Sequence, residues 1–256
     1  MEAYPKGEIP QLIWDYYTLL YFFNYPILFW WESMVETSYR EQKRTRSEFE
    51  RQLHRLEQDT LRMGALVENS FLLAHSALFE RDLEAATRID PQDKQIDQLY
   101  RQIEMDCINL IALQSPVARD LRLLSALMQL IRDIERIGDY AENLGDIAIK
   151  LFPYAPSPYL GELQTMSNRC RAMLAMSLEA LANLDENIGL EIKAKDDVVD
   201  YDYQNIYNLL SSQRVFGEPM EPVMLMVLAI HHLERMADHA TNVGLRVAYI
   251  VTGKIG

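Results

Sequence analysis

The sequence contains few of the residues that mark turns, disulfides and strands. Ten of its 256 residues are glycine, and its ten prolines are separated by long proline-free runs, a pattern that favours long helices. Alternating apolar and polar patterns typical of β-strands are nearly absent. Cys107 and Cys170 are too few for a disulfide framework or a thiolate metal site, which favours a reducing cytoplasm. The sequence therefore predicts an all-α fold.

Positive charge is also scarce. The sequence has 25 Lys and Arg residues against 38 Asp and Glu residues, which gives a formal net charge of −13. Nucleic-acid binding is therefore disfavoured. The sequence has no glycine-rich phosphate loop, no nucleophile elbow and no plausible Cys/His nucleophile pair. It also has no Glu-x-x-His segment, the mark of ferritin-like di-iron proteins. An acidic surface suits cations or basic partner surfaces.

The first 45 residues form an N-terminal extension that differs from the rest. From Leu12 to Trp31 the chain is dense in aromatic residues, and Asp15, Asn24 and Pro26 interrupt it. No basic region precedes this segment, unlike in a signal peptide. Three interpretations stay open: an over-extended translation start with Met34 as the alternative, a membrane-contacting segment, or a docked strand or helix.

Prolines and apolar spacing beyond the extension predict six long helices. Asp90 and Ser115 are expected to cap the second and third helices, ahead of Pro91 and Pro116. The helices form two predicted three-helix bundles joined by a proline-rich connection. The second and third helices are expected to begin at 91 and 116, and the other four to span 46–88, 160–184, 190–213 and 222–251. The expected domains are 1–45, 46–152 and 160–252.

One segment occurs twice. Ile134–Asn143 and Leu233–Asn242 share the pattern apolar-Glu-Arg-apolar-small-Asp-x-Ala-x-Asn. Asp93–Asp97 and Asp196–Asp200 form a second pair of segments, about 103 residues apart, whereas the first pair is about 99 residues apart. The difference is about one helical turn, which a connection between helices absorbs. The chain is therefore interpreted as a tandem duplication.

Each repeat carries acidic pairs, spaced four residues apart, on its second and third helices. A spacing of four places both members on one helical face, and two pairs from adjacent helices bring four carboxylates together. Chance alone yields roughly five or six such pairs in a chain this acidic, so a single pair is weak evidence for a metal site. The metal-site interpretation depends on the pairs occupying equivalent positions in both repeats. Hard cations such as Mg²⁺, Ca²⁺, Mn²⁺ or iron suit such oxygen ligands. The candidates are Asp93, Asp97, Glu135 and Asp139 in the first repeat, and Asp196, Asp200, Glu234 and Asp238 in the second.

Four neighbouring residues are candidates for supporting roles. Arg136 and Arg235 are expected to pair with carboxylates of neighbouring helices or to orient metal ligands. Asn143 and Asn242 either contact a ligand or tether helices to each other.

Three histidines occur only in the second repeat, where the first has Arg132, Asp133 and Tyr140. A duplicated function cannot depend on them. His239, next to Asp238, either joins one metal site or, as expected here, is an exposed helix histidine. The histidines are His231, His232 and His239.

The two repeats, with their acidic pairs and their duplicated third-helix motif, resemble the PhoU family of phosphate-transport and phosphate-signalling regulators. The segment Met63–Glu68 resembles that family's opening, and the resemblance covers residues 46–252. It implies an all-helical cytoplasmic protein that often oligomerises, with a dimer expected here. It also implies that the eight carboxylates bind multinuclear iron or zinc clusters.

The resemblance further implies a negative regulator of the phosphate-starvation response. Its implied partners are the phosphate ABC transporter, through its ATPase subunit, and the membrane-bound phosphate-sensing histidine kinase. Two alternatives stay open. One is a metalloenzyme such as a two-metal phosphohydrolase, for which no base or pocket is evident. The other is a plain helical scaffold whose carboxylates are solvated surface.

Overall fold

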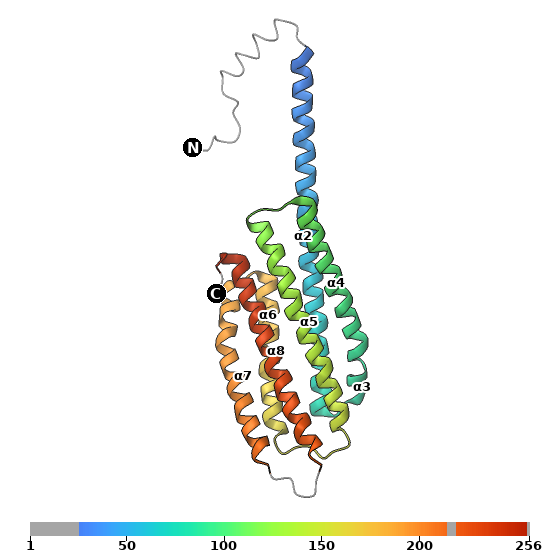
Figure 1. The fold of residues 1–256 in the computed structure, drawn as a ribbon, viewed down its shortest axis with the longest axis vertical. Coiled ribbons are helices and arrows are strands. Elements are labelled where there is room, and N and C mark those ends of the chain that lie inside the picture. The colour runs from blue at the N-terminus through green and yellow to red at the C-terminus, as the bar shows by residue number, and fades with distance from the viewer. Residues whose placement is uncertain (1–25, 214–218, 255–256) are drawn as a thin grey trace. The chain divides into compact units, whose positions relative to one another are not determined.

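The computed structural model describes residues 26–213 and 219–254, and its regular structure there is helical (Figure 1). Most of the aromatic segment, residues 12–25, lies outside the described residues. The described helices are α2 (Pro26–His75), the π-helix η1 (Ser76–Glu80), α3 (Leu83–Thr87), α4 (Ile89–Gln114), α5 (Arg119–Leu151), α6 (Leu160–Asn183), α7 (Glu186–Ser212) and α8 (Glu221–Thr252).

The helices form two consecutive groups of three long helices, as the sequence predicts. In the first group, α2, α4 and α5 meet at Gly138, where an added Cβ would lie 3.4 Å from the Ile96 side chain and 3.5 Å from that of Val67. In the second group, α6, α7 and α8 all pack against one another. The third helices of the two groups, α5 and α8, pack together along their length and join the repeats (Figure 1). The predicted tandem all-α fold is confirmed.

Apolar residues at helical spacing explain this packing. Along α5, Leu124, Leu127, Ile131, Ile134 and Ala141 are fully buried or nearly so. Steps of three and four residues keep these side chains on one stripe, which lies in the core while the polar residues of α5 face outward.

The predicted first helix, 46–88, does not continue through its whole range. The α-helix ends at His75, the π-helix follows, and Arg81 adopts a left-handed conformation with φ 60°. Asp82 then caps α3 by accepting hydrogen bonds from the backbone N–H groups of Glu84 and Ala85, at 3.0 and 3.1 Å. Apolar periodicity continues across this break, which is why the sequence predicted one helix.

The second repeat has the same break at the equivalent place. Leu184 is left-handed with φ 49°, and Asp185 caps α7 through the N–H groups of Asn187 and Ile188. A left-handed residue followed by an aspartate cap is therefore a shared feature of the two repeats.

Two predicted caps are wrong. Asp90 lies inside the first turn of α4, which begins at Ile89, and it pairs with Lys94 at 2.7 Å. Ser115 ends α4 in a left-handed conformation, φ 45°, and α5 begins only at Arg119. Pro116 therefore lies in the connection between the two helices and not at the start of α5.

The chain divides into two compact units, residues 1–52 and residues 53–256, so both repeats belong to one unit except for the first part of α2. The domain limits 1–45, 46–152 and 160–252 stay a prediction. Met34, the alternative start, lies within α2 and is exposed. Within the described ranges, no helix is both long and apolar enough to cross a membrane.

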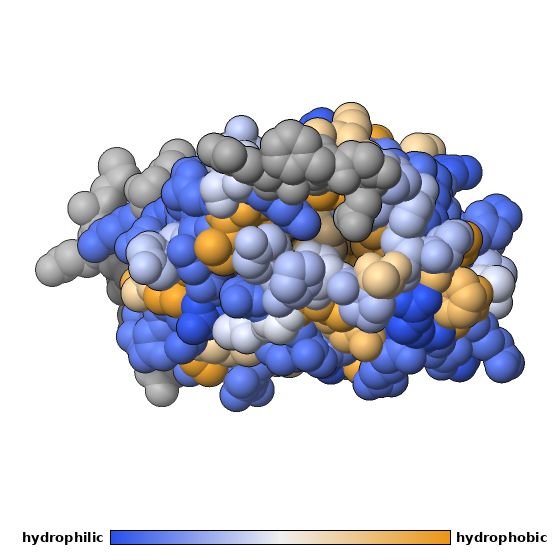
Figure 2. All heavy atoms as spheres, turned by 90° about the horizontal axis from the view of Figure 1, so that it is seen from below, coloured by the Kyte–Doolittle hydropathy of each residue, from blue (hydrophilic) through white to orange (hydrophobic). Residues whose placement is uncertain are grey.

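The connection between the repeats closes one end of the bundle. It lines a pocket of about 420 Å³ together with the ends of α5, α7 and α8. Arg81 lies over the Phe152 ring, and its Nη1 donates to the backbone oxygen of Tyr154 at 3.2 Å. Figure 2 shows the molecule from this side, where apolar residues form several patches between hydrophilic ones. The contacts of Arg81 therefore hold the first repeat to the connection.

Candidate metal-binding carboxylate sites

The first carboxylate site lies between α4 and α5, which run in opposite directions (Figure 1). The negative charges of these side chains act on one another across the two helices: Asp139 of α5 raises the pKa of Asp93, and Asp97 and Asp93 of α4 raise the pKa of Glu135. The four predicted side chains of this repeat therefore come together on one flank of the bundle. The Glu135 and Asp139 side chains are half-buried, at 21% and 32% exposure.

Gathering these anions in a half-buried site disfavours their charged forms. Burial, followed by the negative charges of Asp139, Asp97 and Asp90, raises the pKa of Asp93 to about 6. Burial is also the main cause that raises the pKa of Glu135 and of Asp139. The first site is therefore electrostatically unfavourable when its carboxylates are all ionised, and a bound cation would relieve this.

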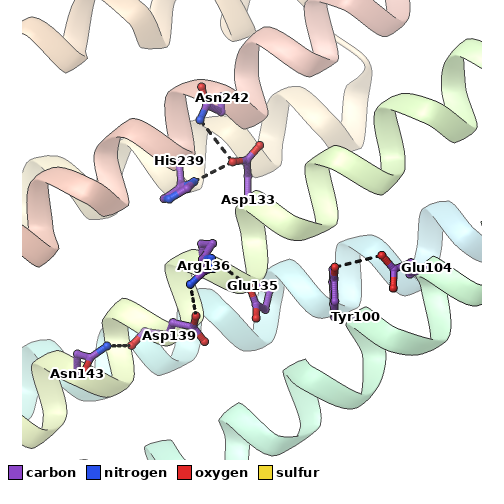
Figure 3. A network of polar contacts seen from close by, with 9 residues as sticks. All are labelled: Tyr100, Glu104, Asp133, Glu135, Arg136, Asp139, Asn143, His239 and Asn242. Atoms are coloured by element: carbon purple, nitrogen blue, oxygen red, sulfur yellow. Dashed lines mark hydrogen bonds and ion pairs between the residues drawn. The ribbon is translucent and has the colours of Figure 1, made fainter.

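Arginines offset part of this negative charge. Arg136 Nη1 donates to Asp139 Oδ2 at 3.2 Å, and its Nε lies 3.9 Å from Glu135 Oε2 (Figure 3). Arg101 pairs with Asp97 one turn along α4. Arg136 thus contacts carboxylates of its own helix, whereas the sequence left open a pairing with a neighbouring helix.

The second carboxylate site repeats this arrangement between α7 and α8. Asp196 is 5% exposed, and burial followed by the charge of Asp238 raises its pKa. Burial and the charge of Asp238 likewise raise the pKa of Glu234, and Asp200 contributes to both shifts. Arg235 Nη1 donates to Asp238 Oδ2 at 2.6 Å, matching the role of Arg136.

Two oxygens of the second site are buried without a hydrogen-bond partner. They are Asp196 Oδ1 and Glu234 Oε2. The other Asp196 oxygen lies 3.4 Å from Lys193 Nζ. A buried carboxylate oxygen without a partner is unfavourable, and a cation would satisfy it.

The carboxylates fit a metal ion in their donor atoms but not in their present conformations. Among the residues that the structure describes, no three Asp, Glu, His or Cys side chains are placed to hold one ion together. Asp139 is paired with Arg136, and Asp238 with Arg235. Metal binding would require these side chains to turn from arginine to the ion.

The two asparagines of the repeated motif have different partners. Asn143 Nδ2 donates to the backbone oxygen of Asp139 at 2.8 Å, within α5. Asn242 Nδ2 donates to Asp133 Oδ1 at 3.4 Å and so connects α8 to α5 (Figure 3). Asn242 thus forms the predicted tether between helices, and Asn143 does not.

His239 is not the exposed histidine that the sequence predicted. Its side chain is 13% exposed, and its Nδ1 lies 2.8 Å from Asp133 Oδ1 across the α5–α8 interface. His231 is half exposed, with its Nδ1 3.9 Å from Glu234 Oε2. His232 has a buried Nδ1 without a hydrogen-bond partner. The three histidines therefore do not all lie on the solvent-exposed face of α8.

Glu142 is an acidic residue near the first site that sequence analysis missed. Burial, followed by the charge of Asp93, raises its pKa. It lies three residues after Asp139 on α5, a spacing that places both on one face. The second repeat has Thr241 at the equivalent position, so the duplication that marks the other carboxylates gives no signal for Glu142.

Comparison with known proteins agrees with the duplicated fold. The family model described as "PhoU domain" matches the chain twice, at residues 60–148 and 163–247. A phosphate-specific transport system accessory protein PhoU homolog from Synechocystis sp. is 56% identical over 209 residues, which span 82% of this chain and 93% of that protein. The Pseudomonas putida homolog of the same description is 32% identical over 209 residues, spanning 80% of this chain and 81% of that protein.

Two crystal structures share the fold. PhoU from Pseudomonas aeruginosa has a TM-score of 0.77 and 31% identity, covering 80% of this chain and 100% of that chain. The phosphate transport system regulatory protein PhoU from Streptococcus pneumoniae has a TM-score of 0.74 and 30% identity, covering 81% of this chain and 99% of that chain.

Proposed function

Because this chain belongs to the PhoU family, we propose that it is a negative regulator of phosphate uptake and of phosphate-starvation signalling. The observation that carries this proposal is the double match to the family, with a complete set of four carboxylates in each matched region. The relatives are named as accessory and regulatory proteins of phosphate transport, which supports a role as an adaptor and not as an enzyme.

The eight carboxylates hold metal clusters in this proposal. Iron or zinc is the expected metal, and the oxygen donors also suit manganese, magnesium or calcium. The raised carboxylate pKa values and the two buried oxygens without partners support this assignment. Bound cations would supply local positive charge on a chain of net charge −13, where a carboxylate or phosphate of a partner can bind.

The partners in this proposal are the phosphate ABC transporter, through its ATPase subunit, and the phosphate-sensing histidine kinase. The naming of the relatives after the phosphate-specific transport system supports the first partner. Such an adaptor works in the cytoplasm and at the inner face of the plasma membrane, as a homodimer. The net negative charge argues against nucleic acid as a partner.

A complementation experiment tests this function. A strain that lacks the gene should take up phosphate and express phosphate-starvation genes in phosphate-rich medium, and the wild-type gene should restore repression. A variant with Glu135→Gln, Asp139→Asn, Glu234→Gln and Asp238→Asn should restore much less, provided that it is folded. A matched variant with Asp106→Asn and Glu162→Gln, outside both sites, is the control. Unchanged uptake and expression in the deletion strain would refute the regulatory role. Full repression by the carboxylate variant would refute only the metal requirement.

A further inference from the structure

A polar bridge joins the two repeats at the α5–α8 interface (Figure 3). Its centre is Asp133 on α5, whose Oδ1 lies 2.8 Å from His239 Nδ1 and accepts from Asn242 Nδ2 at 3.4 Å. The Asp133 and His239 side chains are 15% and 13% exposed, so their contact is largely shielded from water. Shielded polar groups of this kind are strongly unfavourable when one partner is removed.

The residues of this polar bridge occupy equivalent positions in the two repeats. The offset of about 99 residues lays Asp133 on His232 and Tyr140 on His239. The duplicated equivalent of the Asp133–His239 contact is thus a contact between His232 and Tyr140, whose ring centroids lie 5.5 Å apart. Tyr140 also stacks on His239 at 5.9 Å. These four residues, the inter-repeat bridge, form a continuous contact between α5 and α8.

Both ends of the inter-repeat bridge lie on the helical turns that carry metal-ligand candidates. Asp133 precedes Glu135 by two residues on α5, and His239 directly follows Asp238 on α8. His239 also lies near Asp139, across the repeat boundary. Tyr140, next to Asp139 on α5, lies against the Arg235 guanidinium of α8. A shift of the α5 turn that carries Asp139 is therefore transmitted by direct contacts to the α8 turn that carries Asp238, and the reverse also holds.

We propose that the inter-repeat bridge couples the two carboxylate sites, so that a cation bound in one repeat raises the affinity of the other site. This inference rests on the proposed role of the carboxylates as metal ligands. An ion that gathers Glu135 and Asp139 fixes the α5 turn that carries them. Because the bridge joins that turn to the turn of Asp238, the second site is ordered before its own ion arrives. Asp133 and His239 act as positioning residues in this scheme.

A double-mutant cycle on metal affinity tests the coupling. Metal-free full-length protein is titrated with Mn²⁺, and in parallel with Zn²⁺. The first site is disabled by Glu135→Gln with Asp139→Asn, or the second by Glu234→Gln with Asp238→Asn. With the bridge intact, disabling either site should weaken the remaining site about fivefold or more, and the two effects should be equal because coupling is reciprocal.

The same titrations are then repeated in an Asp133→Ala background. There the affinity of each site should no longer depend on the other, while both sites still bind ions. Asp133→Asn, which keeps an acceptor oxygen in place, should restore part of the coupling. Asp106→Ala on α4 is the matched control and should leave the coupling unchanged, because the Asp106 carboxylate accepts from Gln102 of its own helix at 2.9 Å. Melting curves without metal confirm that each variant is folded.

The outcomes separate the two proposals. Ions that bind both sites independently in the wild type, or coupling that persists in Asp133→Ala, would overturn the bridge as the coupling element while leaving the metal sites intact. A wild-type protein that takes up neither Mn²⁺ nor Zn²⁺ in the carboxylate sites would refute the metal assignment itself and the coupling with it.

Discussion

Asp93 shows at the level of a single residue how these sites oppose folding of the metal-free chain. Its pKa rises to about 6 because it is buried and faces Asp139, Asp97 and Asp90. A carboxyl group whose pKa is higher in the folded than in the unfolded chain stabilises the fold only while it is protonated. Its contribution is complete below the ordinary value of 3.8 and is lost as the pH rises through about 6.

Asp93→Asn is therefore expected to stabilise the metal-free protein at neutral pH. The full pKa shift corresponds to about 3 kcal/mol, and partial solvent exposure reduces the expected gain to about 1–2 kcal/mol. Chemical denaturation with chelator present, between about pH 4 and pH 7, should show the wild type losing stability relative to the variant. With metal added, the order should reverse because the wild type keeps its ligand.

Asp106→Asn, further along α4, is the control for this measurement and should leave the pH profile unchanged. If Asp93→Asn is less stable than the wild type in chelator at neutral pH, burial and charge repulsion do not make the ionised Asp93 destabilising, and the prediction is wrong.

Residue patterns predicted which carboxylates come together but not what surrounds them. Spacing and duplication identified Asp93, Asp139 and their counterparts because a fixed helical period places them on one face. His239 was predicted to be exposed, because the partner that shields it, Asp133, lies 106 residues away on another helix. Contacts between helices distant in sequence leave no periodic signal in one chain.

At the scale of elements, α7 and α8 approach closely at a pair of glycines. A Cβ added to Gly189 would lie 2.5 Å from the backbone oxygen of Gly244, and one added to Gly244 would lie 2.7 Å from the backbone oxygen of Gly189. Backbone atoms cannot move aside as a side-chain end can. This crossing therefore fixes how closely α7, with Asp196 two turns further on, lies against α8.

Gly189→Ala is expected to destabilise the protein by about 1–3 kcal/mol, because the helices must separate. Gly161→Ala is the matched control: Gly161 lies in the first turn of α6 with nothing within 4 Å of an added Cβ. Alanine there should be neutral or stabilising by up to about 1 kcal/mol. Thermal denaturation of both variants checks this, and equal stability of the two would contradict the close approach.

Helices were easier to predict than their ends. Long apolar stripes and few glycines indicated every long helix, whereas the breaks at Arg81 and Leu184 depend on left-handed backbone conformations at residues that rarely adopt them. The aspartates that follow the two breaks, Asp82 and Asp185, occupy equivalent positions at the offset of 103 residues. Local backbone geometry, and not composition, sets these boundaries.

At the scale of the whole molecule, the two repeats share one compact unit because α5 and α8 pack against each other. Sequence duplication predicted the two bundles but not this shared interface, since residues that meet across it, such as Asp133 and His239, lie 106 residues apart. The consequence is that the two carboxylate sites are parts of one body, joined by the inter-repeat bridge, and not properties of separate domains.

The metal content of the protein decides whether the eight carboxylates bind metal. The chain is purified without chelator, added metal or a histidine tag, beside the variant with Glu135→Gln, Asp139→Asn, Glu234→Gln and Asp238→Asn, and both are measured by elemental analysis. We expect iron, zinc or manganese in the wild type, at one ion or more for each carboxylate site, and almost none in the variant. Equal metal content in the two proteins, or none in either, would refute the assignment of the carboxylates as metal ligands.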